Sequence, residues 1–284
     1  MPEGHTIHRL ARELRDAFGG RVVKVSSPQG RFADGAHQVD GAVLSSTDAH
    51  GKHLFLGFDS AAGRSRAPAT EPGGTATCSW VHIHLGLYGK FWIGPGAAPA
   101  PWGAVRMRIE NDDAYADLRG PTRCEIIDPG EKAVLHGRLG PDPVRADDPE
   151  TALRRISASR TSIAVLLMDQ SVIAGVGNVY RAEVLFRAGL DPATPGREVE
   201  PAVLRAIWAD LVLLMRRGVE VGRIDTVRPE HEPAAMGRAP REDAHGGEVY
   251  VYRRAGLPCH VCGTEVRTRE AAARNLFWCP TCQA

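Results

Sequence analysis

Four cysteines near the carboxyl end constrain this chain more than any other feature. They follow the spacing Cys259-x2-Cys262-x16-Cys279-x2-Cys282. Two Cys-x2-Cys pairs at this separation supply four thiolates in the tetrahedral arrangement of a structural zinc site. A segment this short cannot bury enough apolar surface to fold alone, so metal binding would supply the missing free energy. The sequence therefore predicts one structural Zn²⁺ in a small terminal module.

Other potential metal ligands do not form a second pattern of this kind. Cys78 and Cys124 are isolated in the sequence, so they do not indicate a disulfide framework, and a reducing cytoplasm fits them best. His82 and His84 alternate with apolar residues of a predicted strand. Because no third ligand follows at a suitable spacing, we interpret them as part of a polar outer face.

Length and charge exclude several classes of protein. The 284 residues suggest about two domains, and 43% hydrophobic with 24% charged residues argues against wholesale disorder. The formal net charge of +1 excludes a histone-like or polyanionic protein but leaves DNA binding open, since binding needs only a local basic face. No run approaches the ~18 apolar residues of a membrane span, and no secretory signal is visible. We therefore expect a cytoplasmic protein without a membrane partner.

The amino-terminal part reads as one helix followed by strands. Apolar residues recur at helical spacing from Ile7 to Phe18, and two glycines end the run. Residues 81–85 and 105–110 alternate apolar with polar side chains, which is typical of half-buried strands. Further segments of this kind up to Ile127 indicate an antiparallel sandwich or barrel. Two tracts rich in small residues, 60–79 and 94–103, are predicted to be surface loops.

The pattern changes near Asp128. Residues 150–218 have helical periodicity, whereas 224–247 is polar and rich in proline, glycine and charge. We therefore predict an α+β multidomain fold. Its parts are an N-terminal helix plus antiparallel β-sandwich (1–128), a helical domain (129–223), a flexible loop (224–247) and a zinc finger (248–284).

The amino terminus offers a candidate nucleophile. Removal of Met1 would expose a secondary amine at Pro2. An α-amino group titrates near ~8, so a large fraction is neutral and nucleophilic at pH 7. Attack of such an amine on a sugar C1′ can form an iminium, and Glu3 beside it could shuttle protons. Alone, this start is better explained as an unremarkable terminus.

Two further motifs are also weak in isolation. Gly51-Lys52 precedes an apolar strand, where a lysine is ordinarily a solvated charge. Glycine-broken turns lie between the apolar run Ile163–Met168 and a predicted helix that begins near Asn178. Such turns present backbone N–H groups, and here the Asn178 amide, to an anion at a helix start. A plain helix–turn–helix corner is the alternative.

Taken together and in order, these features resemble the formamidopyrimidine-DNA glycosylase/endonuclease VIII family of bifunctional base-excision glycosylases. The resemblance covers almost the whole chain. The family pattern has Pro-Glu-Gly at the start, Gly-Lys before a strand, a helix–two-turn–helix segment ending Gly-x-Gly-Asn, and a terminal zinc finger. The segment from Arg274 to Gln283 is similar to the family's finger, in which an arginine stands five residues before the third cysteine.

The resemblance implies a role for each matching residue. Pro2 would be the Schiff-base nucleophile and Glu3 the proton donor for base release. Lys52 would contact a phosphate and take part in β-elimination. Asn178 and Arg274 would bind the phosphates that flank the lesion, with Arg274 also linked to δ-elimination.

A glycosylase must also fill the space that an extruded base leaves. The segment 84–89 resembles the family's wedge loop, in which Leu87 would insert into the duplex and Tyr88 would support it. An apolar residue after a strand is, however, more often part of a core. Arg138 lies in a segment that resembles one near the domain junction that also approaches DNA.

Two departures from the family pattern bear on the substrate. Thr6 stands where many relatives have glutamate, which puts a secondary role of that carboxylate in doubt. Residues 117–123 lack the phenylalanine of the Arg-Arg-Phe-Gly stretch that fills the void in the 8-oxoguanine branch. The Leu-Tyr-Gly of the wedge loop and the Phe-Trp-Cys-Pro of the finger are closer to the endonuclease VIII side.

The resemblance thus implies a monomeric, bacterial-type, nucleoid-associated DNA glycosylase/AP lyase of base excision repair. It would act on double-stranded DNA with oxidised bases, pyrimidines favoured, or with abasic sites, and nick by β/δ-elimination. A catalytically inactive damage-binding homologue is one alternative, which the intact Pro2, Glu3, Lys52 and Arg274 disfavour. A zinc-finger DNA-binding regulator is another, for which the amino-terminal motifs would be coincidences.

Overall fold

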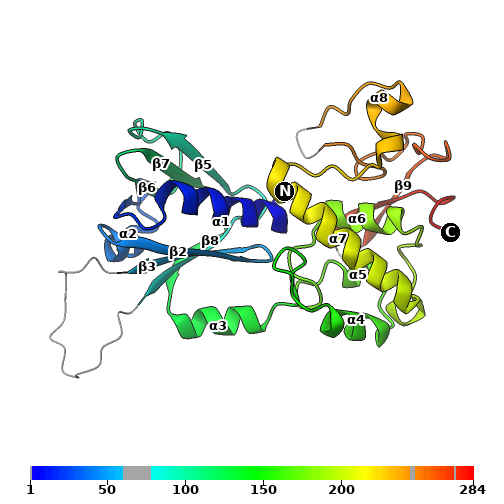
Figure 1. Ribbon diagram of the computed structural model, residues 1–284, viewed down its shortest axis with the longest axis horizontal. Helices are drawn as coiled ribbons and strands as arrows, with labels where there is room; N and C mark the ends of the chain where they lie inside the picture. Colours follow the sequence, from blue (N-terminus) through cyan, green and yellow to red (C-terminus); the bar gives the residue numbers. More distant parts are fainter. Residues whose placement is uncertain (1, 60–77, 244–246, 272) are drawn as a thin grey trace. The chain divides into compact units, whose positions relative to one another are not determined.

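The computed structural model describes residues 2–59, 78–243, 247–271 and 273–284, and the chain forms two compact units (Figure 1). The first unit comprises Met1–Pro2 and Ile7–Arg138, and the second comprises Glu3–Thr6 and Leu139–Ala284. Most of the tract 60–79, predicted as a loop, lies outside the described residues, and Ser79 begins a strand. Among the described residues, no helix is both long and apolar enough to cross a membrane.

The first unit combines helices with two four-stranded antiparallel sheets, in the orders β1-β6-β7-β5 and β2-β3-β4-β8. Its helices are α1 (Gly4–Phe18), α2 (Ala33–Val39) and α3 (Pro129–Gly137). Its strands are β1 (Lys24–Ser26), β2 (Val43–His50), β3 (His53–Asp59), β4 (Ser79–His84), β5 (Lys90–Pro95), β6 (Val105–Glu110), β7 (Ala114–Arg119) and β8 (Arg123–Ile127). The predicted sandwich is confirmed.

Alternation of side chains builds the core of this unit. Leu54 and Leu56 of β3 point to one face and pack in one buried cluster with Ile83 of β4 and Met107 and Leu118 of the other sheet. The intervening positions of β3 and β4 therefore lie on the outer face of the sheet. One side of α1 completes the core, as its helical periodicity predicts.

Helix α3 belongs to the first unit. A capping box starts it, because the Asp128 carboxylate accepts from Glu131 N at 2.7 Å and the Glu131 carboxylate accepts from Asp128 N at 2.9 Å. Lys132 then extends over the outer sheet face, with its Nζ 3.4 Å from the centroid of the Trp80 ring. This packing carries the unit to Arg138, beyond the change of sequence pattern at Asp128.

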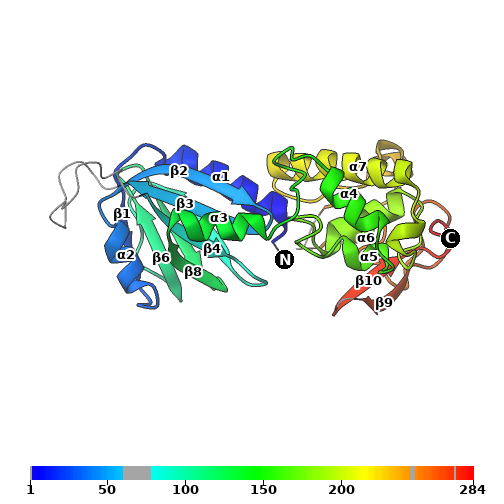
Figure 2. The same cartoon turned by 90° about the horizontal axis from the view of Figure 1, so that it is seen from below.

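The second unit is mainly helical and ends in a two-stranded hairpin (Figure 2). Its elements are α4 (Glu150–Ser157), α5 (Ile163–Leu166), α6 (Asn178–Arg187), η1 (Gly196–Glu198), α7 (Pro201–Val221), η2 (Pro229–His231), α8 (Pro233–Met236), β9 (Arg267–Ala271) and β10 (Arg274–Trp278). The described part of 224–247 contains the short helices η2 and α8, with irregular chain around them.

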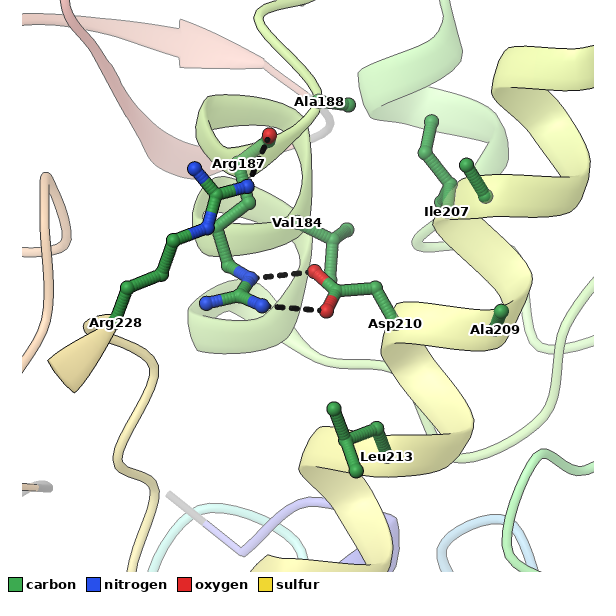
Figure 3. A pocket seen from close by; sticks show the side chains of 9 residues that line it. Val184, Arg187, Ala188, Ile207, Ala209, Asp210, Leu213 and Arg228 are labelled. Atoms are coloured by element: carbon green, nitrogen blue, oxygen red, sulfur yellow. Dashed lines mark hydrogen bonds and ion pairs between the residues drawn. The ribbon is translucent and has the colours of Figure 1, made fainter.

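Helix α6 is the centre of this unit, because every residue from Asn178 to Phe186 is buried. At its end, Arg187 donates to both carboxylate oxygens of Asp210 on α7, at 2.5 and 2.7 Å (Figure 3). Arg187 also donates to the carbonyl of Thr226 at 2.6 Å. These bonds join α6, α7 and the segment after α7 around one guanidinium.

Candidate active site and metal centre

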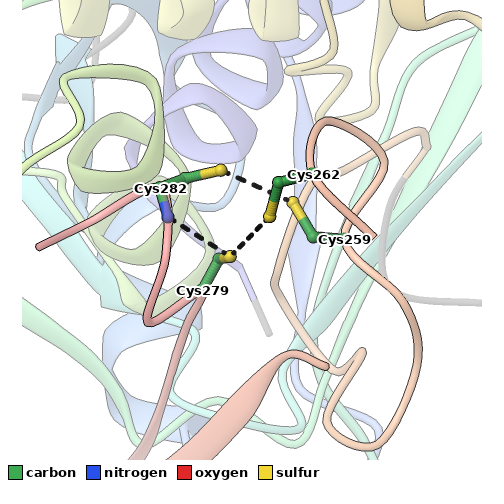
Figure 4. A group of neighbouring side chains, drawn as sticks. All are labelled: Cys259, Cys262, Cys279 and Cys282. Carbon is green, nitrogen blue, oxygen red and sulfur yellow. Dashed lines mark hydrogen bonds between the residues drawn. The ribbon is translucent and has the colours of Figure 1, made fainter. Parts of the chain in front are cut away.

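The four cysteines of the sequence pattern converge at one point (Figure 4). Their Sγ atoms all lie within 4.8 Å of one another, with Cys259–Cys282 at 3.9 Å and Cys262–Cys279 at 3.4 Å. A tetrahedral zinc site with bonds of ~2.3 Å has sulfur–sulfur edges of about 3.8 Å. The donor set and its spacing therefore fit one structural Zn²⁺.

Local backbone geometry supports each cysteine pair. Val261 N lies 3.4 Å from the Cys259 sulfur, and Cys282 N lies 3.5 Å from the Cys279 sulfur. Gly263 closes the first turn at a φ of +75°, a conformation that side chains with a Cβ rarely adopt. Between the two pairs, the chain forms the β9–β10 hairpin, which carries Arg274.

Glu3 lies fully buried at the start of α6. Its carboxylate accepts hydrogen bonds from Gly177 N at 2.9 Å, from Val179 N at 2.8 Å and from Tyr180 N at 3.4 Å. The first N–H groups of a helix lack partners within the helix, and the helix dipole favours negative charge at this end. These bonds therefore stabilise the ionised form of Glu3.

Glycine is required where Glu3 meets the turn. A Cβ at Gly177 would lie 2.3 Å from the Glu3 carboxyl carbon, and a Cβ at Gly4 would lie 2.8 Å from the Cα of Gly175. Gly4 N also donates to the Gly175 carbonyl at 2.8 Å. As expected, this turn presents backbone N–H groups to an anion at the helix start, and that anion is the Glu3 carboxylate.

Asn178 joins α6 to the zinc-finger hairpin. Its Nδ2 donates to the carbonyl of Asn275 in β10 at 2.9 Å, and its Oδ1 accepts from Arg181. The Arg181 guanidinium also donates to the carbonyls of Asn275, at 3.4 Å, and Ala271, at 3.3 Å. The structure thus places Asn178 beside the hairpin that begins β10 with Arg274.

Arg181 is a functional candidate that the sequence interpretation missed. It is 0% exposed. Burial lowers its pKa to about 10, while the negative charge of Glu3 raises it and the positive charge of Arg274 lowers it further. At neutral pH the guanidinium is still protonated, so it provides a buried positive charge that interacts with Glu3. An arginine flanked by the apolar residues of this helix was the available signal.

Glu183 is a second buried charge that the sequence interpretation missed. Its carboxylate accepts from three consecutive backbone N–H groups, those of residues 250–252, at 2.7, 2.9 and 2.8 Å. The Thr226 hydroxyl donates to it at 2.6 Å. Glu183 therefore fixes the segment that leads into the zinc finger against α6.

The first unit carries the other candidate catalytic residues. Pro2 is half-buried and directly precedes Glu3 in the chain. Lys52 lies in the tight turn between β2 and β3, where Gly51 adopts a φ of +57°. Arg138 is exposed at the carboxyl end of α3.

The segment that resembles a wedge loop projects apolar surface into solvent. Leu87 is 42% exposed and Tyr88 is 84% exposed, in the turn that follows β4. The alternative interpretation of Leu87 as a core residue is therefore wrong. Gly86 starts this turn at a φ of +67°, which brings the chain out of the sheet.

His82 and His84 lie on the outer face of their sheet, as expected, but His82 is not a solvated group. Its side chain is 1% exposed, and both ring nitrogens form hydrogen bonds with neighbouring side chains. The four cysteines form the group of three or more potential metal ligands that lie close together in the described part of the chain. His82 and His84 do not belong to such a group.

Three family models together match most of the chain. Residues 1–124 match the formamidopyrimidine-DNA glycosylase N-terminal domain, and residues 139–229 match the formamidopyrimidine-DNA glycosylase H2TH domain. Residues 256–284 match the zinc finger found in FPG and IleRS.

Individual relatives agree with these matches. The chain is 50% identical to endonuclease 8 1 of Mycobacterium tuberculosis, with 100% of each chain covered. It is 30% identical to the DNA-(apurinic or apyrimidinic site) lyase Nei2 of Mycolicibacterium smegmatis, over 100% of this chain and 99% of that protein. The fold is similar to that of Lactococcus lactis Fpg in a complex with an abasic site containing DNA, with a TM-score of 0.75, 19% identity and 99% of each chain covered.

Proposed function

The chain belongs to the formamidopyrimidine-DNA glycosylase/endonuclease VIII family, and from this premise we propose that Pro2 is the nucleophile of a bifunctional DNA glycosylase/AP lyase of base excision repair. The single observation that supports it most is the fixed carboxylate of Glu3, because Glu3 directly follows Pro2. The secondary amine of Pro2 therefore stands next in the chain to a carboxylate that can carry a proton.

The residues supply the steps of this reaction in turn. The neutral Pro2 nitrogen attacks C1′, the glycosidic bond breaks, and Glu3 transfers to the departing base a proton that it has taken from the proline ammonium. The proton of the attached amine then moves to O4′ as the C1′–O4′ bond breaks, which gives an iminium and a 4′ hydroxyl. Removal of a C2′ proton then expels the 3′ phosphate in β-elimination, and removal of a C4′ proton expels the 5′ phosphate in δ-elimination.

Phosphate binding involves cations from separate parts of the chain. Lys52 binds a phosphate and takes part in β-elimination, and Arg138 approaches the DNA backbone. Arg274 and Asn178 bind the phosphates beside the lesion, and Arg274 contributes to δ-elimination. The buried bonds of Asn178 and Arg181 to the hairpin support this assignment, since they fix the strand on which Arg274 stands.

The zinc finger holds the hairpin. One Zn²⁺ on the four cysteines supplies folding free energy to a segment too small to fold alone, and it takes no part in the chemistry. The functional domains we propose are the catalytic β-sandwich, the helical domain with α6, the intervening loop and this finger. The protein acts as a monomer on double-stranded DNA in the cytoplasm.

The wedge loop indicates the substrate. Oxidised pyrimidines such as thymine glycol have lost ring planarity and stack poorly, so extruding them requires less free energy than extruding a purine. Leu87 and Tyr88 are exposed apolar side chains that can occupy the vacated position. With the phenylalanine of the 8-oxoguanine branch missing from 117–123, we propose that oxidised pyrimidines are the preferred bases.

Single-turnover excision from defined duplexes tests this proposal. We expect faster release of thymine glycol than of 8-oxoguanine opposite cytosine. Leu87→Ala should slow both reactions, whereas Leu213→Ala, which shortens an exposed leucine of α7, should slow neither. Equal or faster excision of 8-oxoguanine opposite cytosine contradicts the preference, and absence of any excision would point to a damage-binding homologue.

A further inference from the structure

The outer face of the sheet β2-β3-β4-β8 gathers histidines beside the Lys52 turn. Strand register aligns side chains across the sheet in two neighbouring rows. The row nearest the turn is His50, His53, His84 and Arg123. The next row is Asp48, Phe55, His82 and Glu125.

Three of these side chains form one hydrogen-bonded path. His82 Nδ1 lies 2.9 Å from the Glu125 carboxylate, and His82 Nε2 lies 2.9 Å from His53 Nδ1. The ionised carboxylate can only accept, so His82 Nδ1 carries a proton and donates. In a neutral His82, Nε2 then accepts from His53 Nδ1–H, which leaves His53 Nε2 as an acceptor. One carboxylate therefore sets the tautomers of two rings.

The surroundings keep these rings neutral. Burial lowers the pKa of His53 to about 3, and the neighbouring His82, His84, His50 and His136 lower it further. Burial also lowers the pKa of His82, although Glu125 opposes this shift. Against the cost of burial, the bond from His82 holds the pKa of Glu125 below its usual value.

Every element packed against this path contributes a charged or titratable group. Helix α3 contributes Lys132, whose Nζ is 2.9 Å from Asp48 of β2, and His136, whose Nδ1 is 3.2 Å from His50 Nδ1. Strand β8 contributes Arg123 in addition to Glu125, at 3.4 Å from it. His84 of β4 bonds Thr122 at 2.9 Å. Charged and titratable groups from these elements therefore flank the path.

Two observations connect the path to Lys52. His53 is the next residue in the chain and the first residue of β3, so a hydrogen bond that holds its side chain acts directly beside Lys52. The positive charge of Lys52 also acts on His84, in the row of His53. A proton on this row would therefore place a second positive charge near Lys52.

We propose that Glu125, His82 and His53 form a positioning relay that holds the Lys52 turn in one orientation and without added charge for phosphate binding. The inference rests on the phosphate-binding role proposed for Lys52. None of the three residues need touch DNA. The relay acts through the turn that it fixes.

Kinetics on abasic-site duplex separate positioning from general destabilisation. Glu125→Ala leaves the His82 Nδ1–H without its partner and should raise the KM for nicking about tenfold with little change in kcat. Glu125→Gln retains an accepting oxygen and should restore most of the loss. Glu13→Ala is the matched control, because Glu13 is also a partly exposed carboxylate of this unit with an ion pair, to Arg9. It should leave KM unchanged.

A double-mutant cycle tests whether the effect passes through Lys52. When Lys52→Ala is present, Glu125→Ala should change KM less than about twofold. An unchanged KM in Glu125→Ala, or an equal rise with and without Lys52, would overturn the relay. If Lys52→Ala alone has no effect, the proposed role of Lys52 fails instead, and with it the positioning function.

Histidine ¹⁵N NMR shows whether the relay itself exists. His82 and His53 of the wild type should both carry their proton on Nδ1 at neutral pH. Glu125→Ala should shift His82 toward the Nε2–H form. Nε2–H tautomers at both rings in the wild type would contradict the relay, whatever Lys52 does.

Discussion

Helix α6 of the second unit and the histidine rows of the first unit both bury polar side chains, but their chemistry is opposite. Around α6 the buried groups are two carboxylates and a guanidinium, those of Glu3, Glu183 and Arg181. Around Lys52 the corresponding groups are His53 and His82, which burial keeps neutral. The first set is fixed by backbone hydrogen bonds, and the second by bonds between side chains.

The two regions therefore differ in the hydrogen-bond partners that their buried groups require. A buried carboxylate needs several donors to offset its lost hydration, and Glu3 and Glu183 obtain them from consecutive backbone N–H groups. Neutral imidazoles need fewer partners, but a proton added at low pH changes both their charge and their tautomers. The groups around α6 are therefore held by the backbone, whereas a proton added at low pH would change the hydrogen bonds of the histidine region.

Removing the metal from the second unit should have the largest effect. Cys279→Ser takes away one of four zinc ligands, so the hairpin with Arg274 should lose its position and DNA nicking should be abolished. Elemental analysis together with a nicking assay measures both consequences. Cys78→Ser, at an isolated cysteine, should retain zinc and activity. A zinc-free Cys279→Ser protein that nicks at the wild-type rate would refute the role of the finger.

Removing a buried carboxylate that bonds to the backbone should have the next largest effect. Glu183→Ala leaves the N–H groups of residues 250–252 without their acceptor, and it should lower the free energy of unfolding by about 3–5 kcal/mol. Denaturant unfolding gives this value. The exposed Glu198→Ala should change it little. A loss below ~1 kcal/mol for Glu183→Ala would mean that these donors find other partners.

Replacing Arg181 should lower the rate of DNA nicking more than it lowers the stability of the protein. Arg181→Met keeps the apolar bulk but removes the donors to Asn275 and Ala271, so nicking of abasic DNA should fall about tenfold while the protein stays folded. Arg181→Lys, which keeps the charge without the forked donors, should give an intermediate rate. Single-turnover kinetics provides the measurement, with Arg205→Met on the surface as the control. Wild-type rates for Arg181→Met would show that the hairpin is fixed without it.

The smallest expected effect is a pH dependence of stability that comes from the histidine region of the first unit. Since His53 has its pKa lowered to about 3 from an ordinary 6.5, the folded state binds fewer protons than the unfolded state between these values. Stability from His53 is thus fully present above pH ~6.5 and is lost as the pH falls toward ~3. His82 and His84, whose pKa values burial also lowers, act in the same direction.

Unfolding free energies at pH 7 and pH 5.5 check this sign. In this interval the wild type should lose more stability than His53→Phe, which has no titrating ring at the position. Carboxylates contribute little here, because they titrate at lower pH. Identical losses in the two proteins would show that His53 is protonated normally in the folded state.

Local patterns in the sequence predicted much of this architecture. The Cys-x2-Cys spacing, the helical period of Ile7–Phe18 and the alternation in β4 and β6 each depend on neighbouring residues, and the structure confirms all three. The Gly-x-Gly-Asn motif correctly marked an anion at the start of α6. It could not identify that anion, because Glu3 lies 174 positions from Gly177 in the chain.

The histidine relay could not be predicted from the sequence either, because its members are far apart in the chain. Alternation placed His82 on the outer face, but its partners are 29 and 43 positions away, and only strand register brings them together. The alternation of a strand also does not show which element covers its outer face. Here α3, which follows β8 in the chain, packs on the outer face of β4. The buried charges Arg181 and Glu183 were visible as polar residues in an apolar helix, but their partners lie in the zinc-finger segment.

Borohydride trapping on an abasic-site duplex tests the central claim, that Pro2 is the nucleophile, most directly. Protein with a free Pro2 amine should become covalently attached to the DNA, because the iminium is reduced to a stable amine. A protein extended before Pro2 should not be trapped, while Glu3→Gln should still be trapped on this substrate, whose base is already gone. Trapping that survives the extension would contradict the account and move the nucleophile to Lys52 or another amine.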